Sequence, residues 1–315
     1  MQKNKKPKYN LTSSPIYKLA NPKKLAELLL WNLKDLENLA NRNDNYECWK
    51  EGERDIQHPK QQLKLIHERI MKLLSRIETP DYLHSAVQGK SYITNAKAHI
   101  GTTLQYKLDI KKFYPSTKFW HIYQFLHDDM KCPKDVATLL CKLITFKPKN
   151  GEAHLPTGSP ASPILAYFSH MRMFDKIQNL AGSRGVNMTC YVDDITFSGE
   201  KMPKSLISNC MNVISDRKLE YHTKPEKLKF YGPSHAAIAT GCAISKDCIL
   251  LPFKRHEKIK TAREAFFEAT DINMQKSSIN SLLGMLSEAT QIDARFHFLK
   301  QQILERKRYL EKIQG

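Results

Sequence analysis

The sequence predicts an α+β fold with a helical C-terminal part, and three observations support this class. Segments with apolar residues at helical spacing are interleaved with a few short segments of strand character. Residues 188–198 (MTCYVDDITFS) have the pattern of strand, two-residue turn and strand, with Asp193-Asp194 expected at the tip. From about Phe253 the periodicity is helical. Helices interleaved with antiparallel strands are typical of α+β proteins.

The individual elements follow from periodicity and from breaking residues. Helices are expected over 19–40, 60–77, 118–130, 133–145, and from the Gly/Pro/Ser-rich run after 155 to about Leu180. The polar segment 41–59 predicts a connection with a turn at Gly52. Further strands are expected at 104–110, ended by Pro115, around 227–232, and around 238–244.

The charge of the chain favours a polyanionic partner. Fifty lysine and arginine residues against 32 aspartate and glutamate residues give a formal net charge of +18. Nucleic acid is the commonest partner of so basic a protein. Seven lysines precede the first acidic residue, Glu27. That segment is either a solvated, partly disordered tail or an arm that contacts phosphates, and the residues leave both open.

The expected compartment is the cytoplasm. No run approaches the roughly 18 apolar residues of a membrane span, and the lysine-rich start is unlike a secretory signal. The seven cysteines form no Cys-x-x-Cys pair, which argues against a disulfide scaffold.

Three aspartates form the candidate chemical centre. Asp193-Asp194 alone is also good turn chemistry, but the flanking residues are apolar enough to bury the hairpin in a sheet. Neighbouring carboxylates on buried strands repel each other unless a divalent cation balances them. Asp109, at the end of a predicted strand, is the natural third ligand. Hard oxygen ligands favour Mg²⁺ or Mn²⁺, and two such ions support in-line phosphoryl transfer.

Three segments, in chain order, resemble the palm motifs of reverse transcriptases. They are 108–116 (LDIKKFYPS), 155–166 (LPTGSPASPILA) and 191–194 (YVDD). Finer features resemble the bacterial retron class, namely 52–59 (GERDIQHP), Asn95-Ala96 with His99, and 239–241 (ATG), where the family usually has Val-Thr-Gly. The resemblance covers residues 50–245.

The resemblance implies a right-hand polymerase with fingers, an antiparallel palm sheet and a helical thumb. It divides the chain into a basic N-terminal extension at 1–45, interleaved fingers and palm at 46–245, and a thumb at 246–315. The implied reaction is RNA-templated DNA synthesis. The implied partners are a structured non-coding RNA, deoxynucleotides (dNTPs), the single-stranded DNA product and a separate effector protein in anti-phage defence, with no membrane.

The resemblance also assigns roles to single residues. Two metal ions would be bound by Asp109, Asp193, Asp194 and the backbone carbonyl of Ile110. The incoming nucleotide would be contacted by Lys50, Arg54, Tyr114, Thr157, Gly158 and Lys227. Among these, Tyr114 would be the aromatic gate against a 2′-hydroxyl and Lys227 a proton donor near the leaving pyrophosphate. RNA would be contacted by Asn95, His99, Thr240 and Gly241.

Two departures and two alternatives accompany this interpretation. Thr157 stands where the family usually has Gln, and Tyr167 where it prefers Asn, so nucleotide selection is open to change at both positions. One alternative function is a reverse transcriptase of another bacterial defence class, which would lack the paired inverted repeats of a retron in its flanking DNA. The other is a non-catalytic RNA-binding protein on a polymerase scaffold, against which the intact carboxylate trio argues.

Overall fold

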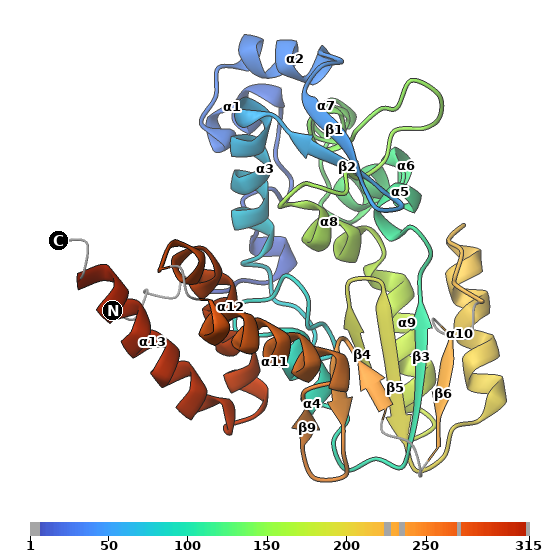
Figure 1. The fold of residues 1–315 in the computed structure, drawn as a ribbon. Coiled ribbons are helices and arrows are strands. Elements are labelled where there is room, and N and C mark those ends of the chain that lie inside the picture. The colour runs from blue at the N-terminus through green and yellow to red at the C-terminus, as the bar shows by residue number, and fades with distance from the viewer. Residues whose placement is uncertain (1–6, 224–227, 233–236, 270–271, 313–315) are drawn as a thin grey trace.

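The computed structural model describes residues 7–223, 228–232, 237–269 and 272–312, and shows the mixed helix-and-sheet architecture that the sequence predicts (Figure 1). The helical elements, in chain order, are η1 (Leu11–Ser13), α1 (Pro22–Leu29), α2 (Leu33–Asn41), α3 (Gln61–Leu74), α4 (Tyr92–Lys97), α5 (Phe113–Ser116), α6 (Phe119–Gln124), the π-helical turn η2 (Phe125–Asp129), α7 (Lys134–Ile144), α8 (Ser162–Ser169), α9 (Met171–Gly182), α10 (Lys204–Asp216), α11 (Phe253–Glu268), α12 (Ile272–Ile292) and α13 (Phe296–Lys312). The strands are β1 (Tyr46–Glu51), β2 (Arg54–Pro59), β3 (Leu104–Asp109), β4 (Asn187–Tyr191), β5 (Asp194–Gly199), β6 (Lys229–Tyr231), β7 (Ala237–Ala239), β8 (Cys242–Ile244) and β9 (Ile249–Leu250).

The N-terminal part packs on α3. The segment before α1 is not a free tail from Pro7 onward, because the Tyr9 backbone pairs with Arg76 and Glu78 and Ile16 is buried. The single helix expected over 19–40 is wrong. It divides into α1 and α2 because Leu30 adopts a left-handed conformation with φ 63°, which ends the first helix.

The segment 41–59, expected as a polar connection, contains an antiparallel hairpin. Strands β1 and β2 pair in register from Tyr46 opposite Pro59 to Glu51 opposite Arg54, and Gly52 turns the chain with φ 60°. Most β1 side chains are exposed, so the alternation that predicts a half-buried strand is absent from the sequence.

A four-stranded antiparallel sheet in the order β4-β5-β3-β6, the central sheet, lies between α11 on one side and α10 on the other (Figure 1). Helices α9 and α10 pack on each other beside it, and α9 contacts β4. The helix expected from the Gly/Pro/Ser run to Leu180 breaks between α8 and α9 at His170, whose φ and ψ leave the helical region. Residues of this sheet, of α1–α3 and of α5–α10 share one large hydrophobic core.

The C-terminal helices have a core of their own. Leu251 just before α11, with Ile259, Phe266, Leu282 and other apolar residues of α11–α13, forms a second cluster, separate from the large one. A small third cluster joins α4 to the three-stranded sheet β7-β8-β9. Among the described residues, no helix is both long and apolar enough to cross a membrane.

Candidate active site

The three predicted aspartates meet at one end of the central sheet. Asp109 is the last residue of β3 and lies in register opposite Asp194, the first residue of β5. The backbone N–H of Ile110 donates to the carbonyl oxygen of Asp193 at 3.0 Å. The predicted tertiary meeting of Asp109 with the hairpin is therefore confirmed, although the two parts lie far apart in the sequence.

The turn of the β4–β5 hairpin sits one residue earlier than expected. Tyr191 pairs with Asp194, so the two turn residues are Val192 and Asp193, and Asp194 already belongs to β5. Val192 has φ 60°, and its N–H donates to the Ser85 hydroxyl at 3.0 Å. A β-branched residue in this region is strained, and such strain is concentrated at functional sites.

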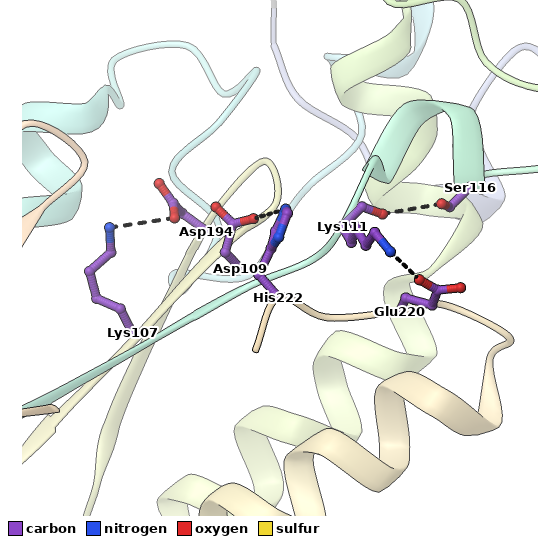
Figure 2. Close-up of polar contacts among 7 residues, drawn as sticks. All are labelled: Lys107, Asp109, Lys111, Ser116, Asp194, Glu220 and His222. Carbon is purple, nitrogen blue, oxygen red and sulfur yellow. Dashed lines mark hydrogen bonds and ion pairs between the residues drawn. The ribbon is translucent and has the colours of Figure 1, made fainter. Parts of the chain in front are cut away.

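Two basic side chains face the carboxylates (Figure 2). Lys107 Nζ lies 3.5 Å from Asp194 Oδ1, and His222 Nε2 lies 3.4 Å from Asp109 Oδ1. Sequence reasoning missed both residues. Lys107 was detectable in principle, because it lies two residues before Asp109 on the same face of β3. His222 was not, because only the return of the chain after α10 pairs its N–H with the Asp109 carbonyl, at 2.9 Å.

The donor set suits a hard divalent cation. Asp109, Asp193 and Asp194 offer carboxylate oxygens at one strand end, and oxygen is the ligand that Mg²⁺ and Mn²⁺ prefer. Within the part of the chain that the structure describes, no three His, Cys, Asp or Glu side chains are already gathered as a ligand set. The three aspartates thus fit a divalent cation by the type of their ligand atoms and by their closeness in the fold.

Tyr114 lies beside this centre on α5, the short helical turn that follows β3. Burial is the main cause that raises the pKa of its hydroxyl, and the charges of Asp193 and Tyr191 raise it further. Its ring stacks on Phe113 at 6.2 Å between centroids.

The expected strand end at Pro115 is wrong, because β3 ends at Asp109 and Pro115 belongs to α5. The position of Tyr114 agrees with that of a gate, and the role stays a prediction.

The predicted nucleotide-pocket loop docks on β2 through Thr157 and Gly158. The Thr157 N–H donates to Gln57 Oε1 at 3.0 Å, and the Gly158 N–H donates to the Gln57 carbonyl at 3.1 Å. A Cβ on Gly158 would stand 2.8 Å from the Gln57 carbonyl oxygen. Gln57, which sequence reasoning missed, is buried and holds the loop against the hairpin.

A buried histidine supports the same loop from behind. His67 of α3 donates from Nε2 to the Leu143 carbonyl at 2.8 Å and accepts the Ser159 hydroxyl at Nδ1, at 2.6 Å. Full burial lowers its pKa to about 4. The neutral ring therefore connects α3, α7 and the loop, and nothing in its local sequence marks this role.

The remaining predicted nucleotide contacts are Lys50, Arg54 and Lys227. Lys50 and Arg54 are exposed near the tip of the β1–β2 hairpin, where Lys50 pairs in register with Asp55 and Arg54 with Glu51. Lys227 lies outside the described residues.

Asn95 and His99 lie inside the protein rather than on its surface, and their expected contact with RNA stays a prediction. Both are fully buried. The two ring nitrogens of His99 are 2.7 Å from the hydroxyls of Ser198 and Thr189, on β5 and β4. Burial lowers the pKa of His99 to about 3, which keeps the ring neutral. The residue connects the segment after α4 to the central sheet.

Thr240 and Gly241 form the turn of the β7–β8 hairpin, with φ values of 46° and 85°. The Thr240 hydroxyl donates to the Tyr92 carbonyl at 2.9 Å, and Asn95 Nδ2 lies 3.5 Å from the Thr240 oxygen. A Cβ on Gly241 would lie 2.9 Å from an Arg255 nitrogen. The two retron-like elements therefore contact each other, while Thr240 and Gly241 stay half-buried, and their contact with RNA stays a prediction.

Comparison with known proteins agrees with this geometry. A family model described as reverse transcriptase (RNA-dependent DNA polymerase) matches residues 48–280. The Retron Ec86 reverse transcriptase of Escherichia coli is 25% identical over 247 residues, which cover 78% of this chain and 73% of that protein. The Retron Se72 reverse transcriptase of Salmonella heidelberg is 33% identical over 150 residues, or 47% of this chain and 38% of the relative. The Retron Mx65 reverse transcriptase of Myxococcus xanthus is 32% identical over 163 residues, with the same two shares of 47% and 38%.

The chain belongs to the reverse transcriptase family, the class of RNA-dependent DNA polymerases. Within that class, the relatives support a bacterial enzyme of the retron type with RNA-directed DNA polymerase activity.

Proposed function

We propose that this chain copies part of its own structured non-coding RNA into single-stranded DNA that stays joined to the RNA at a branch. The primer would be the 2′-hydroxyl of a guanosine in that RNA, and pyrophosphate would leave from each dNTP. The observation that carries the proposal is the register of Asp109 opposite Asp194, with Asp193 in the adjoining turn. The retron names of the relatives support the choice of RNA.

The proposed architecture is a right hand. The N-terminal extension covers residues 1–45, the fingers and palm 46–245, and the thumb 246–315. The separate core of α11–α13 supports the assignment of a thumb, and the four-stranded sheet with the aspartates at its end supports that of a palm. The basic C-terminal helices would hold the RNA through its phosphates.

Different residues would have different roles in nucleotide addition. Asp109, Asp193 and Asp194, with the Ile110 carbonyl, would hold two Mg²⁺ or Mn²⁺ ions, which supply activation of the primer hydroxyl and charge neutralisation. Lys107 Nζ and His222 Nε2 lie 3.5 Å and 3.4 Å from oxygens of Asp194 and Asp109, respectively. Tyr114 would exclude a 2′-hydroxyl, since its ring lies near Asp193.

The other contacts would position the incoming dNTP. Lys50 and Arg54 would grip the triphosphate from the hairpin tip, for which a guanidinium suits paired oxygens. Thr157 and Gly158 would line the nucleotide pocket, held by Gln57. Lys227 would give its proton to the leaving pyrophosphate. The system would act in the cytoplasm in anti-phage defence, beside a separate effector protein.

The test is to isolate the nucleic acid that co-purifies with the protein when it is expressed with its native flanking DNA. Wild type is compared with Asp193→Asn/Asp194→Asn and with Asp216→Asn/Asp247→Asn, a matched change of two exposed aspartates. We expect a discrete single-stranded DNA in wild type and in the matched control, and none in the first variant. Its mobility should change after RNase and after debranching.

Each other outcome removes a defined part of the proposal. DNA without a branch would leave the polymerase and remove the retron assignment. DNA absent from all three proteins, with no dNTP incorporation on a generic RNA template, would leave only RNA binding.

A further inference from the structure

A pocket of about 630 Å³ lies away from the aspartates, between the α2–β1 connection, α6, α7 and the segment that follows α7. Its wall includes Arg42, Lys118, Lys142 and Lys147, whereas none of Asp109, Asp193 and Asp194 lines it. The volume falls within the range of pockets that hold small organic ligands. The pocket is therefore a candidate binding site distinct from the candidate active site.

The charge of the pocket favours an anion. Its lining contains those four basic residues and a single acidic one, Glu152. Within the described ranges no ion pair is found for any of the four, and Lys142 Nζ donates instead to the Asn41 amide oxygen at 2.9 Å. Concave surfaces lined by one sign of charge concentrate ligands of the opposite sign. Phosphate groups are anions of this kind.

The rest of the lining suits a planar heterocycle. Half-buried Phe119, Trp120 and Phe146 contribute aromatic wall, and bases stack on such side chains. Asn43 adds an amide group that can both donate to and accept from a base edge, whereas the amide nitrogens of Asn41 and Asn45 already donate to the Glu37 and Leu39 carbonyls. Phosphate-binding cations, aromatic rings and an amide together match a nucleotide better than a bare anion.

The positive surface continues beyond the pocket. The Arg217 guanidinium and Lys218 Nζ each lie 5.4 Å from the centre of the Trp120 ring, although neither residue lines the pocket. Positive charge therefore extends past the edge of the pocket at Trp120. This arrangement suits a nucleic-acid strand, whose neighbouring phosphates would also extend past that edge.

We propose that this pocket binds one unpaired nucleotide of a single-stranded nucleic acid, with the base against the aromatic wall and the flanking phosphates on the lysines. The proposal goes beyond the proposed function, because nucleotide addition at the aspartates does not require the pocket. A free nucleotide shares the same chemistry, and the experiment separates the two sources.

The test uses Trp120 as a reporter inside the pocket. Trp31→Phe/Trp49→Phe leaves Trp120 as the only tryptophan of the chain. The protein is titrated with an unstructured pentauridylate, with uridine monophosphate and with inorganic phosphate. We expect a saturable change of Trp120 emission with the pentanucleotide, at an affinity at least roughly tenfold above that for the monophosphate.

Two matched pairs of substitutions separate the pocket from general charge. In the reporter background, Lys142→Ala/Lys147→Ala should weaken pentanucleotide binding by about tenfold. Lys201→Ala/Lys204→Ala removes the same charge from exposed positions outside the pocket and should change it less than twofold. The Lys142/Lys147 variant should keep dNTP incorporation on a generic template, which separates this test from that of the proposed function.

Cross-linking on the otherwise unaltered protein supplies a second measurement. A pentanucleotide with 4-thiouridine should cross-link to peptides that contain the pocket aromatics, Phe119, Trp120 or Phe146. Cross-links confined to other regions, equal weakening by both lysine pairs, or the same emission change with inorganic phosphate would overturn the nucleotide site. Equal affinity for uridine monophosphate would overturn the assignment to a strand.

Discussion

Gly158 shows at the scale of one residue how closely the nucleotide-pocket loop approaches the β1–β2 hairpin. A Cβ at this position would stand 2.8 Å from the Gln57 carbonyl oxygen and 3.1 Å from Ile56 Cγ2. We expect Gly158→Ala to displace the loop, to cost roughly 1–3 kcal/mol of unfolding free energy through overpacking, and to raise the KM for dNTP several-fold. Urea denaturation and steady-state dNTP incorporation measure these effects.

The matched control is Gly182→Ala at the exposed end of α9, where a Cβ would have no neighbour within 4 Å. That change should leave the KM unaltered. An unaltered KM in Gly158→Ala as well would show that the loop does not position the nucleotide.

For single residues, the sequence indicates candidate positions more readily than it indicates the partners of their side chains. The meeting of Asp109 with Asp193 and Asp194 was predictable, because paired acids on apolar strands repel each other unless a cation binds between them, and a third carboxylate completes such a ligand set. The burial of His99 was not, because its partners Ser198 and Thr189 are hydroxyls distant in sequence. A motif marks such a residue without indicating whether it contacts a ligand or the core.

Between elements, Tyr92, Arg255 and Glu288 join α4, α11 and α12. Arg255 Nη1 lies 2.7 Å from Glu288, the Tyr92 hydroxyl donates to the same carboxylate at 2.5 Å, and the guanidinium lies 5.5 Å from the Tyr92 ring centre. We expect Arg255→Ala to cost roughly 1 kcal/mol, since the pair is partly exposed, and to speed amide hydrogen exchange in β7, β8 and α4.

Lys260→Ala is the control for that change, because it removes a local ion pair with Glu264 on the same α11 helix. Hydrogen exchange followed by mass spectrometry should show no acceleration outside α11 in this variant. Equal patterns in both variants would mean that Arg255 stabilises only its own helix.

The elements themselves were predictable where one face is buried. Helix α3 and the β4–β5 hairpin match their expected ranges closely, because their apolar residues keep a regular period. The β1–β2 hairpin was missed because its first strand exposes both faces, and the break at Leu30 was missed because a left-handed leucine has no sequence signature.

For the molecule as a whole, buried neutral histidines predict loss of stability in acid. Burial lowers the pKa of His67 to about 4 and that of His99 to about 3, whereas an unfolded chain titrates near 6.5. Between those values the unfolded state binds more protons, so the stabilisation is complete above pH 6.5 and falls as the pH falls toward 4. Each histidine contributes a slope of up to about 1.4 kcal/mol per pH unit.

The measurement is urea denaturation at several pH values between 8 and 5, followed by tryptophan fluorescence. His67→Gln should lower stability at every pH and should also reduce the slope below pH 6.5 by about one proton. Above pH 7 the slopes of variant and wild type should agree. A slope that is unchanged below pH 6.5 would show that His67 is protonated in the folded protein.

The separate core of the C-terminal helices has a consequence for cooperativity. Units with their own cores can open independently, so one melting temperature need not describe this chain. All three tryptophans, Trp31, Trp49 and Trp120, precede the C-terminal helices, whereas far-ultraviolet circular dichroism also reports α11–α13. The contacts of α4 with the β7–β9 sheet and with Arg255 and Glu288 join the two cores. The offset between the fluorescence and circular dichroism unfolding curves therefore measures how strongly these contacts couple the C-terminal helices to the rest of the chain.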